Sequence, residues 1–169
     1  ETDPISRAEL VAAVGGDLEL YGERSRAYAA RGESNDLATD QLQELDARAT
    51  LLRAVHASLA PQGGDSRTAD LLADFGARFA GQPDLVAQAA RMRLGALLRL
   101  GRFADAEEEV RRSAESLRME GRGAALRGLA SKSAVDGRMS ESPDDAASAA
   151  RVAVALHSLA DAIGGDAPS

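Results

Sequence analysis

The chain has two histidines, the side chains that most often serve as metal ligands and as general bases near neutral pH. His56 falls on a line of leucines at helical spacing, Leu45, Leu52 and Leu59. This position is typical either of a titratable group in a pocket or of a half-buried histidine hydrogen-bonded to a neighbouring helix. His157 lies near the C-terminal end of a predicted helix, where a cation complements the helix dipole. Neither histidine has the spacing of a zinc site and the chain has no cysteine, so we expect no metal.

Three consecutive acids, Glu107, Glu108 and Glu109, precede the basic pair Arg111 and Arg112. Acids and arginines three and four residues apart form ion pairs on the exposed face of a helix. A pair of catalytic carboxylates is the alternative, but nothing in the spacing singles out one acid as buried. We therefore predict a solvated face here and no catalytic residue.

The sequence Gly-Gly-Asp occurs three times, at 15–17, 63–65 and 164–166. A helix stop followed by an N-cap explains all three. No phosphate-binding loop, dinucleotide-binding glycine pattern, nucleophile elbow or calcium loop is present. The sequence thus predicts a protein that is not an enzyme and that needs no cofactor.

Composition favours an all-α fold. Hydrophobic residues make up 44% of the chain, whereas aromatic residues make up only 3%, so its core must pack through small, helix-forming side chains. A net charge of −7 argues against nucleic acid, which needs a basic face. No run of 18 or more apolar residues occurs, so we expect no membrane insertion.

Apolar residues at helical spacing predict six to seven helices and no sheet. The break at Pro61 and the cap formed by Ser142 and Pro143 are the clearest boundaries. Few apolar residues lie between Ser131 and Ser142, which favours a linker or mobile loop over 132–142. The expected helices are 6–30 (with a break or kink at Gly15 and Gly16), 37–60, 66–80, 84–100, 103–119, a short one over 124–130, and 143–163.

The fourth and fifth of these helices are joined by only two or three residues around Gly101, so they must pack as an antiparallel hairpin. Phe103 begins the second helix and should fold back on the first, while Ala106 leaves room for close approach and Val110 continues the apolar face. Gly101, Phe103 and Ala106, with Val110 in the next large position, resemble the second half of a tetratricopeptide repeat.

That resemblance covers about residues 86–115 and implies antiparallel hairpins stacked as a right-handed solenoid, because one repeat cannot bury both its faces. A compact helical bundle is the alternative. On this interpretation residues 1–131 form the repeat-like domain, 132–142 the linker, 143–164 a C-terminal helix packed on the domain, and 165–169 a tail.

A tetratricopeptide-like hairpin implies a groove lined by the first helix of each unit. Transferring the groove positions residue by residue gives Gln88, Arg91, Gly95, Leu98 and Arg99. Arg91 and Arg99 would project from one face and could hold a carboxylate of an acidic segment, or simply be two exposed arginines. The sequence thus predicts an interaction module that binds a protein, a peptide or a second copy of the chain. The alternative is a helical ligand-binding or regulatory domain of a larger protein, with a pocket near His56.

Overall fold

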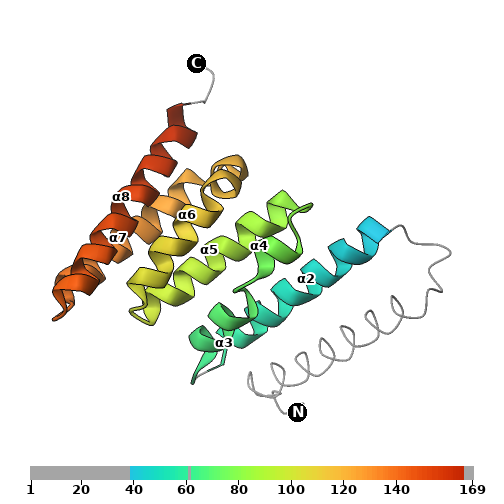
Figure 1. Ribbon diagram of the computed structural model, residues 1–169, viewed down its shortest axis with the longest axis horizontal. Coiled ribbons are helices and arrows are strands. Elements are labelled where there is room, and N and C mark those ends of the chain that lie inside the picture. Colours follow the sequence, from blue (N-terminus) through green and yellow to red (C-terminus); the bar gives the residue numbers. More distant parts are fainter. Residues whose placement is uncertain (1–38, 61, 166–169) are drawn as a thin grey trace, which may run out of the picture.

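The computed structural model describes residues 39–60 and 62–165, and within these ranges the chain is helical with no strand. Its elements are α2 (Thr39–Ser58), α3 (Gly64–Leu71), α4 (Phe75–Arg78), α5 (Pro83–Arg99), α6 (Phe103–Glu120), α7 (Gly123–Met139) and α8 (Pro143–Gly165) (Figure 1). The predicted all-α fold with six to seven helices is confirmed. The helix expected over 6–30 lies outside the described residues.

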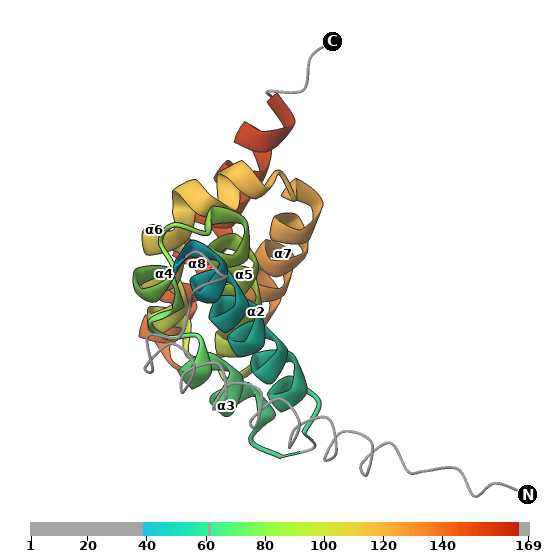
Figure 2. The same cartoon turned by 90° about the vertical axis from the view of Figure 1, so that its right-hand side faces the viewer.

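The helices lie side by side and form hairpins that stack on one another (Figures 1 and 2). Helices α5 and α6 form one hairpin, and α7 and α8 form the next. The two hairpins pack mainly through α6 and α8, whereas α5 and α7 meet only briefly. Helix α3 packs on both α2 and α5, so α5 joins the two ends of the stack.

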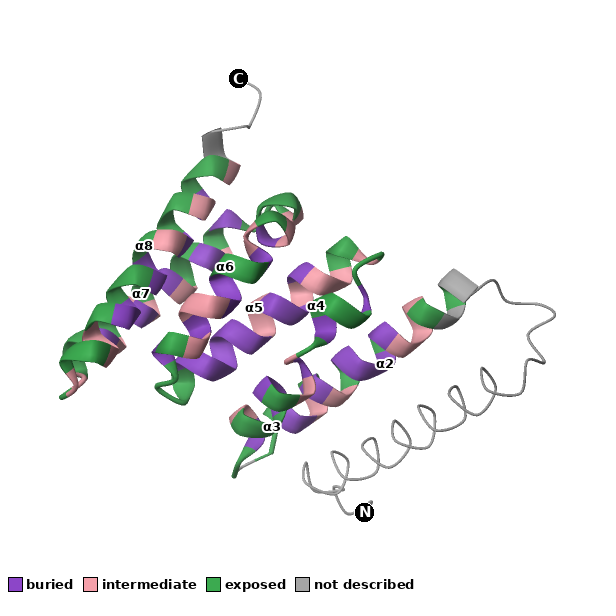
Figure 3. Ribbon diagram, in the orientation of Figure 1, coloured by how far each residue is buried: buried purple, intermediate pink, exposed green. Residues whose placement is uncertain are grey.

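Two groups of buried apolar residues form the core, and α5 contributes to both. Leu94 and Leu97 of α5 belong to the larger group, which extends through α6, α7 and α8. Ala89, on another side of the same helix, belongs to the smaller group, together with residues of α2 and of the segment 72–79. Helix α5 is accordingly buried over most of its length (Figure 3). This central position makes α5 the element that positions its neighbours.

Two turns of the stack begin in the same way, with a glycine in the left-handed region followed by arginine and a new helix. Gly101 has φ of +70° and precedes α6, and Gly121 has φ of +73° and precedes α7. Residues with side chains rarely adopt this backbone conformation. The first turn confirms the predicted hairpin, and Phe103 is buried as expected, with 5% of its surface exposed. The second turn carries the same Gly-Arg pair in the sequence, at Gly121 and Arg122.

The prediction of a linker over 132–142 is wrong for most of its length, because α7 continues to Met139 and only 140–142 connect it to α8. The short helix expected over 124–130 is therefore the beginning of α7. This segment has few large apolar residues because it packs through small ones. The buried Ser133 donates a hydrogen bond from its hydroxyl to the Ala149 carbonyl oxygen at 2.8 Å. The buried Gly137 lets the backbone of α8 approach closely.

Replacing Gly137 with alanine should destabilise the protein. A Cβ atom at this position would lie 2.6 Å from the Ala149 Cβ atom, so α7 and α8 would have to move apart. We expect a loss of about 1–3 kcal/mol in the free energy of unfolding, measured by urea denaturation. Gly128→Ala is the matched control on the same helix, because nothing lies within 4 Å of its added Cβ. It should stabilise by about 0.5–1 kcal/mol, and equal effects of the two changes would contradict the close packing.

The single helix expected over 66–80 is in fact two, α3 and α4, separated by residues 72–74. At the break, the amide groups of Ala73 and Phe75 donate to carbonyl oxygens three residues back, at Asp70 and Leu72, instead of four. Neither proline nor glycine marks this point. Phe75 of α4 and Phe79, the residue after α4, are both buried, with ring centroids 4.7 Å apart. We therefore attribute the break between α3 and α4 to the packing of this segment against α2 and α5.

The line of leucines that contains His56 does not mark the buried side of α2. Leu52 and Leu59 are exposed and His56 is partly exposed. Small residues face the core instead, with Leu51 as the large member. Apolar residues therefore lie on both sides of α2, and periodicity could not select the buried side. The buried apolar residues are Ala47, Ala49, Leu51, Ala54 and Ala57.

Helix α8 starts as predicted, because the Asp145 amide donates to the Ser142 hydroxyl at 3.3 Å and Pro143 is the first helical residue. Over Pro143–Ile163 the helix is long and apolar enough to cross a membrane by length and composition alone. A third of that stretch is buried inside the protein, where Val152 and Leu156 join the core. Core helices of globular proteins satisfy the same criterion.

Candidate functional site

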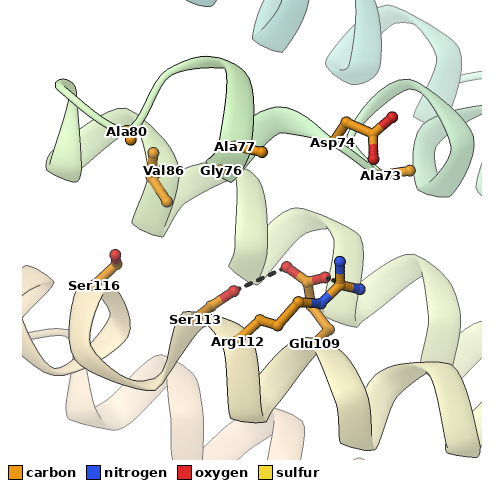
Figure 4. A pocket seen from close by; sticks show the side chains of 10 residues that line it. All are labelled: Ala73, Asp74, Gly76, Ala77, Ala80, Val86, Glu109, Arg112, Ser113 and Ser116. Atoms are coloured by element: carbon orange, nitrogen blue, oxygen red, sulfur yellow. Dashed lines mark hydrogen bonds and ion pairs between the residues drawn. The ribbon is translucent and has the colours of Figure 1, made fainter.

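A hollow of about 350 Å³ lies between α4 and α6, and we call it the α4–α6 pocket (Figure 4). One wall consists of the small residues that accompany α4, and Val86 of α5 completes this side. The opposite wall is α6, which supplies polar side chains. Its lining residues are Ala73, Asp74, Gly76, Ala77, Ala80, Val86, Glu109, Arg112, Ser113 and Ser116.

Glu109 of α6, at the floor of the pocket, forms a buried ion pair with Arg93 of α5, and each has 9% of its side chain exposed. The Arg93 Nη1 group donates to Glu109 Oε2, and its Nε group donates to the Ala69 carbonyl oxygen of α3 at 3.1 Å. The Ser113 hydroxyl donates to Glu109 Oε1 at 2.9 Å. Arg93 therefore links three helices, and both carboxylate oxygens of Glu109 are occupied.

The rim of the pocket is polar and less fully bonded. The Arg112 side chain is 51% exposed, and its guanidinium nitrogens lie 3.5 Å from Glu109 Oε2 and 3.6 Å from Glu108 Oε1. Within the described residues, the Ser116 hydroxyl makes no hydrogen bond and the Asp74 carboxylate makes no ion pair. Figure 4 places Asp74 across the hollow from Arg112, and Ser116 opposite Ala80. The rim thus presents donors from α6 and an acceptor from the facing wall.

These contacts suit binding better than proton transfer. Glu109 accepts hydrogen bonds from Arg93 and Ser113 on opposite oxygens, so it has a positioning role at the floor. The prediction of a fully solvated Glu107–Glu109 face is therefore wrong for Glu109, which is buried. One signal was available: Glu109 lies three residues after Ala106 and four before Ser113, at the edge of the buried stripe of α6.

The structure does not bring the five predicted groove residues together in one hollow. Gly95 and Leu98 are buried, and Gln88 is only partly exposed. Arg91 donates to both carboxylate oxygens of Glu120 on α6, at 2.7 and 3.2 Å. Arg99 donates through two nitrogens to Asp65 Oδ1 on α3, at 2.7 and 2.9 Å. Both arginines therefore connect α5 to neighbouring helices, and their role in partner binding stays a prediction.

Leu98 and Arg99 do line a second hollow, also of about 350 Å³, where the turn before α6 faces the C-terminal end of α7. Its apolar surface comes from Leu98, Phe103 and Met139. Lys132 and Asp136 on its α7 side pair with each other at 2.6 Å. This hollow is more open than the α4–α6 pocket and has no buried charge at its floor.

A pocket was expected near His56. In this region the structure has a smaller hollow of about 170 Å³, at the connection between α2 and α3. Ser58, Gly63 and Asp65 are among the residues that line it, but His56 is not. His157 is exposed on α8. In the described part of the chain, no three His, Asp or Glu side chains gather where a metal ion could be held.

Ion pairs between arginine and acids also connect α8 to the rest of the stack. The Arg151 Nε group of α8 donates to Glu107 Oε1 of α6 at 2.7 Å. This hydrogen bond holds the pKa of the Glu107 carboxyl below its usual value and raises the pKa of Arg151. Arg127 of α7 pairs with Asp161 of α8 at 3.2 Å. Exposed pairs of this kind add little stability individually, so their main effect is on orientation.

Comparison with known proteins yields no match: the chain resembles no protein-family model, no curated protein and no solved structure closely enough to be matched. The assignment of a function therefore depends on the geometry of the stack and its hollows.

Proposed function

We propose that this chain is a non-enzymatic interaction module that binds an extended segment of a partner protein in the α4–α6 pocket. The observation that carries the proposal is the unequal bonding of its polar groups. Those at the floor are buried and paired, whereas Arg112, Ser116 and Asp74 on the rim are exposed or unsatisfied. The rim groups are therefore available to a ligand, and binding them would not break the contacts that hold the helices together.

The size of the pocket favours a protein segment over a large small molecule. A volume of about 350 Å³ is at the lower end of the range for ligand sites, and it accommodates one or two side chains. The wall formed by Gly76, Ala77 and Ala80 has small side chains, which lets an extended backbone approach. The stacked hairpins are consistent with a tetratricopeptide-like scaffold, although the family remains part of the proposal.

The chemistry of the rim indicates an acidic segment. Arginine pairs with carboxylates through charge-assisted hydrogen bonds, and the Arg112 guanidinium is held only at 3.5 and 3.6 Å by its acid neighbours. A carboxylate of the partner would form a shorter and more direct hydrogen bond to Arg112 than either of these contacts. Asp74 would accept hydrogen bonds from backbone amides of the same segment. The pocket also contains acids, Glu109 at the floor and Asp74 on the rim, which repel negative charge placed elsewhere in it. It should therefore select ligands that place one carboxylate at Arg112.

The test is selection from a displayed library of random peptides with the full chain as bait, followed by calorimetry on one selected peptide. We expect enrichment of peptides that contain an acidic residue. Arg112→Ala should weaken binding of the chosen peptide at least about tenfold, because a hydrogen bond to a charged group contributes about 1.5–3 kcal/mol. Added salt should weaken binding as well.

Arg111→Ala is the matched control, because Arg111 is adjacent, is more exposed than Arg112 and does not line the pocket. It should leave the affinity within about twofold. Thermal unfolding of both variants checks that neither change alters the fold. Equal affinities of the wild type and Arg112→Ala for every selected peptide would place the binding surface elsewhere, and failure to enrich any peptide would contradict the proposed function.

A further inference from the structure

The hollow between the turn before α6 and the C-terminal end of α7 shares no lining residue with the α4–α6 pocket, and we call it the α7 hollow. Its deepest lining residues are apolar, since Leu98 and Phe103 are 2% and 5% exposed. Met139 also lines it and is 80% exposed. The side formed by the turn is open, because nothing lies within 4 Å of a Cβ atom built on Gly101. A segment of a partner chain therefore has room to pass over this turn.

Three of the four charged side chains that line the α7 hollow are already paired. Asp65 holds Arg99 through two hydrogen bonds, at 2.7 and 2.9 Å. Lys132 and Asp136 pair with each other at 2.6 Å. The fourth, Asp145, lies in the first turn of α8 and makes no ion pair with any residue that the structure describes. The lining charge that is left for a ligand is thus a carboxylate.

The sequence around this carboxylate is acidic. Residues 136–145 contain four acids and a single base, Arg138, and the whole chain has a net charge of −7. A concentration of one sign of charge attracts ligands of the opposite sign. Basic side chains combine a cationic head with an apolar stem, and the stem commonly lies along apolar surface while the head stays at the edge. An apolar hollow with an unpaired carboxylate at its edge matches this chemistry.

We propose that the α7 hollow binds a basic side chain of a partner protein. The stem would lie against Leu98, Phe103 and Met139, and the cation would pair with Asp145. A volume of about 350 Å³ is enough for one such side chain. Sites for free small molecules bury most of the ligand surface, whereas this hollow is open on one side, so it suits a side chain whose backbone stays outside. The proposal is independent of the function assigned to the α4–α6 pocket.

Nuclear magnetic resonance of the full chain with labelled methionine methyl groups tests this proposal. The chain has three methionines, Met92, Met119 and Met139, and of these Met139 lines the hollow. The probes are tripeptides Gly-X-Gly with blocked termini, in which X is lysine, norleucine or glutamate. Norleucine keeps the apolar stem without the ammonium group, and glutamate reverses the charge. The lysine peptide should shift the Met139 signal in a saturable way and leave that of Met119, which is 65% exposed, unchanged.

Asp145→Asn should weaken binding of the lysine peptide about three- to tenfold, because it removes the charge and keeps the shape of the side chain. Asp144→Asn is the matched control, since Asp144 is the adjacent acid in the same turn of α8 and does not line the hollow. It should leave the affinity within about twofold. Arg112→Ala, which tests the α4–α6 pocket, should have no effect on this peptide. The two sites can therefore succeed or fail separately.

Several outcomes would overturn the proposal. Equal affinities for the lysine and norleucine peptides would show that charge plays no part, and tighter binding of the glutamate peptide would make Lys132 the recognising group. Equal losses in Asp144→Asn and Asp145→Asn would replace a specific contact with the general charge of this helix end. Tighter binding of n-pentylammonium than of the lysine peptide would indicate a site for a free amine. An unshifted Met139 signal, or equal shifts of Met139 and Met119, would show that no such site exists.

Discussion

Replacing Glu109 with alanine is expected to lower the free energy of unfolding by about 3–5 kcal/mol. The change removes the acceptor of Arg93 and leaves a guanidinium with 9% of its side chain exposed and, among the described residues, no other acid in ion-pair contact. The remaining Arg93 bond, to the Ala69 carbonyl, does not neutralise the charge. Urea denaturation followed by circular dichroism measures the loss.

Two further variants show whether this loss comes from the buried charge. Glu108→Ala removes the adjacent, partly exposed acid and should change stability by no more than about 0.5 kcal/mol. Replacing both partners, Arg93→Met with Glu109→Leu, should restore most of the loss, because an apolar pair of similar volume leaves no uncompensated charge. A double variant as unstable as Glu109→Ala would show that the links to Ala69 and Ser113 matter more than the charge.

Replacing Phe103 with alanine is the second change with a large expected effect, a loss of about 3–5 kcal/mol in the free energy of unfolding. Phe103 is the first residue of α6 and belongs to the larger core group, where its ring packs among residues of α5 to α8. Removing the ring leaves a cavity at the point where the turn at Gly101 reverses the chain. The denaturant midpoint should fall while the helical signal before unfolding stays close to that of the wild type.

Leu100→Ala is the control for Phe103→Ala, since Leu100 lies in the same turn but is 39% exposed. Its expected effect is well below that of Phe103→Ala. Similar midpoints for the wild type and Phe103→Ala would mean that the ring contributes nothing to the hairpin, and the interpretation of the turn would be wrong.

Several features of the fold were predictable because they depend on neighbouring residues only. The ends of α5, α6 and α8 agree with the prediction to within one or two residues. Gly101 adopts the left-handed conformation expected of a helix-reversing turn, and Ser142 caps α8 through its hydroxyl. Each of these signals combines a backbone preference with a short-range hydrogen bond, so a single sequence contains it.

The candidate site was less accessible to sequence analysis. Glu107, Glu108 and Glu109 are chemically identical and adjacent, yet only Glu109 is buried, because Arg93 of another helix faces it. Arg91 and Arg99 were predicted to line a groove, but acids on α6 and α3 hold them in ion pairs. The partner of a charged side chain lies 16 to 34 residues away in these cases, beyond the reach of local periodicity.

Helix formation, the hairpin turn and the absence of recognisable catalytic motifs thus follow from residues close together in the chain, where propensity and capping act. Which face of α2 is buried, where α3 ends and how far α7 extends were decided by packing between helices. In α7 the deciding contact is Gly137 against Ala149. The missing side chain of a glycine favours a helix only where the backbone of a neighbouring helix approaches it closely. Small residues do not stand out in a hydrophobic pattern, and their contribution depends on the shape of the partner helix.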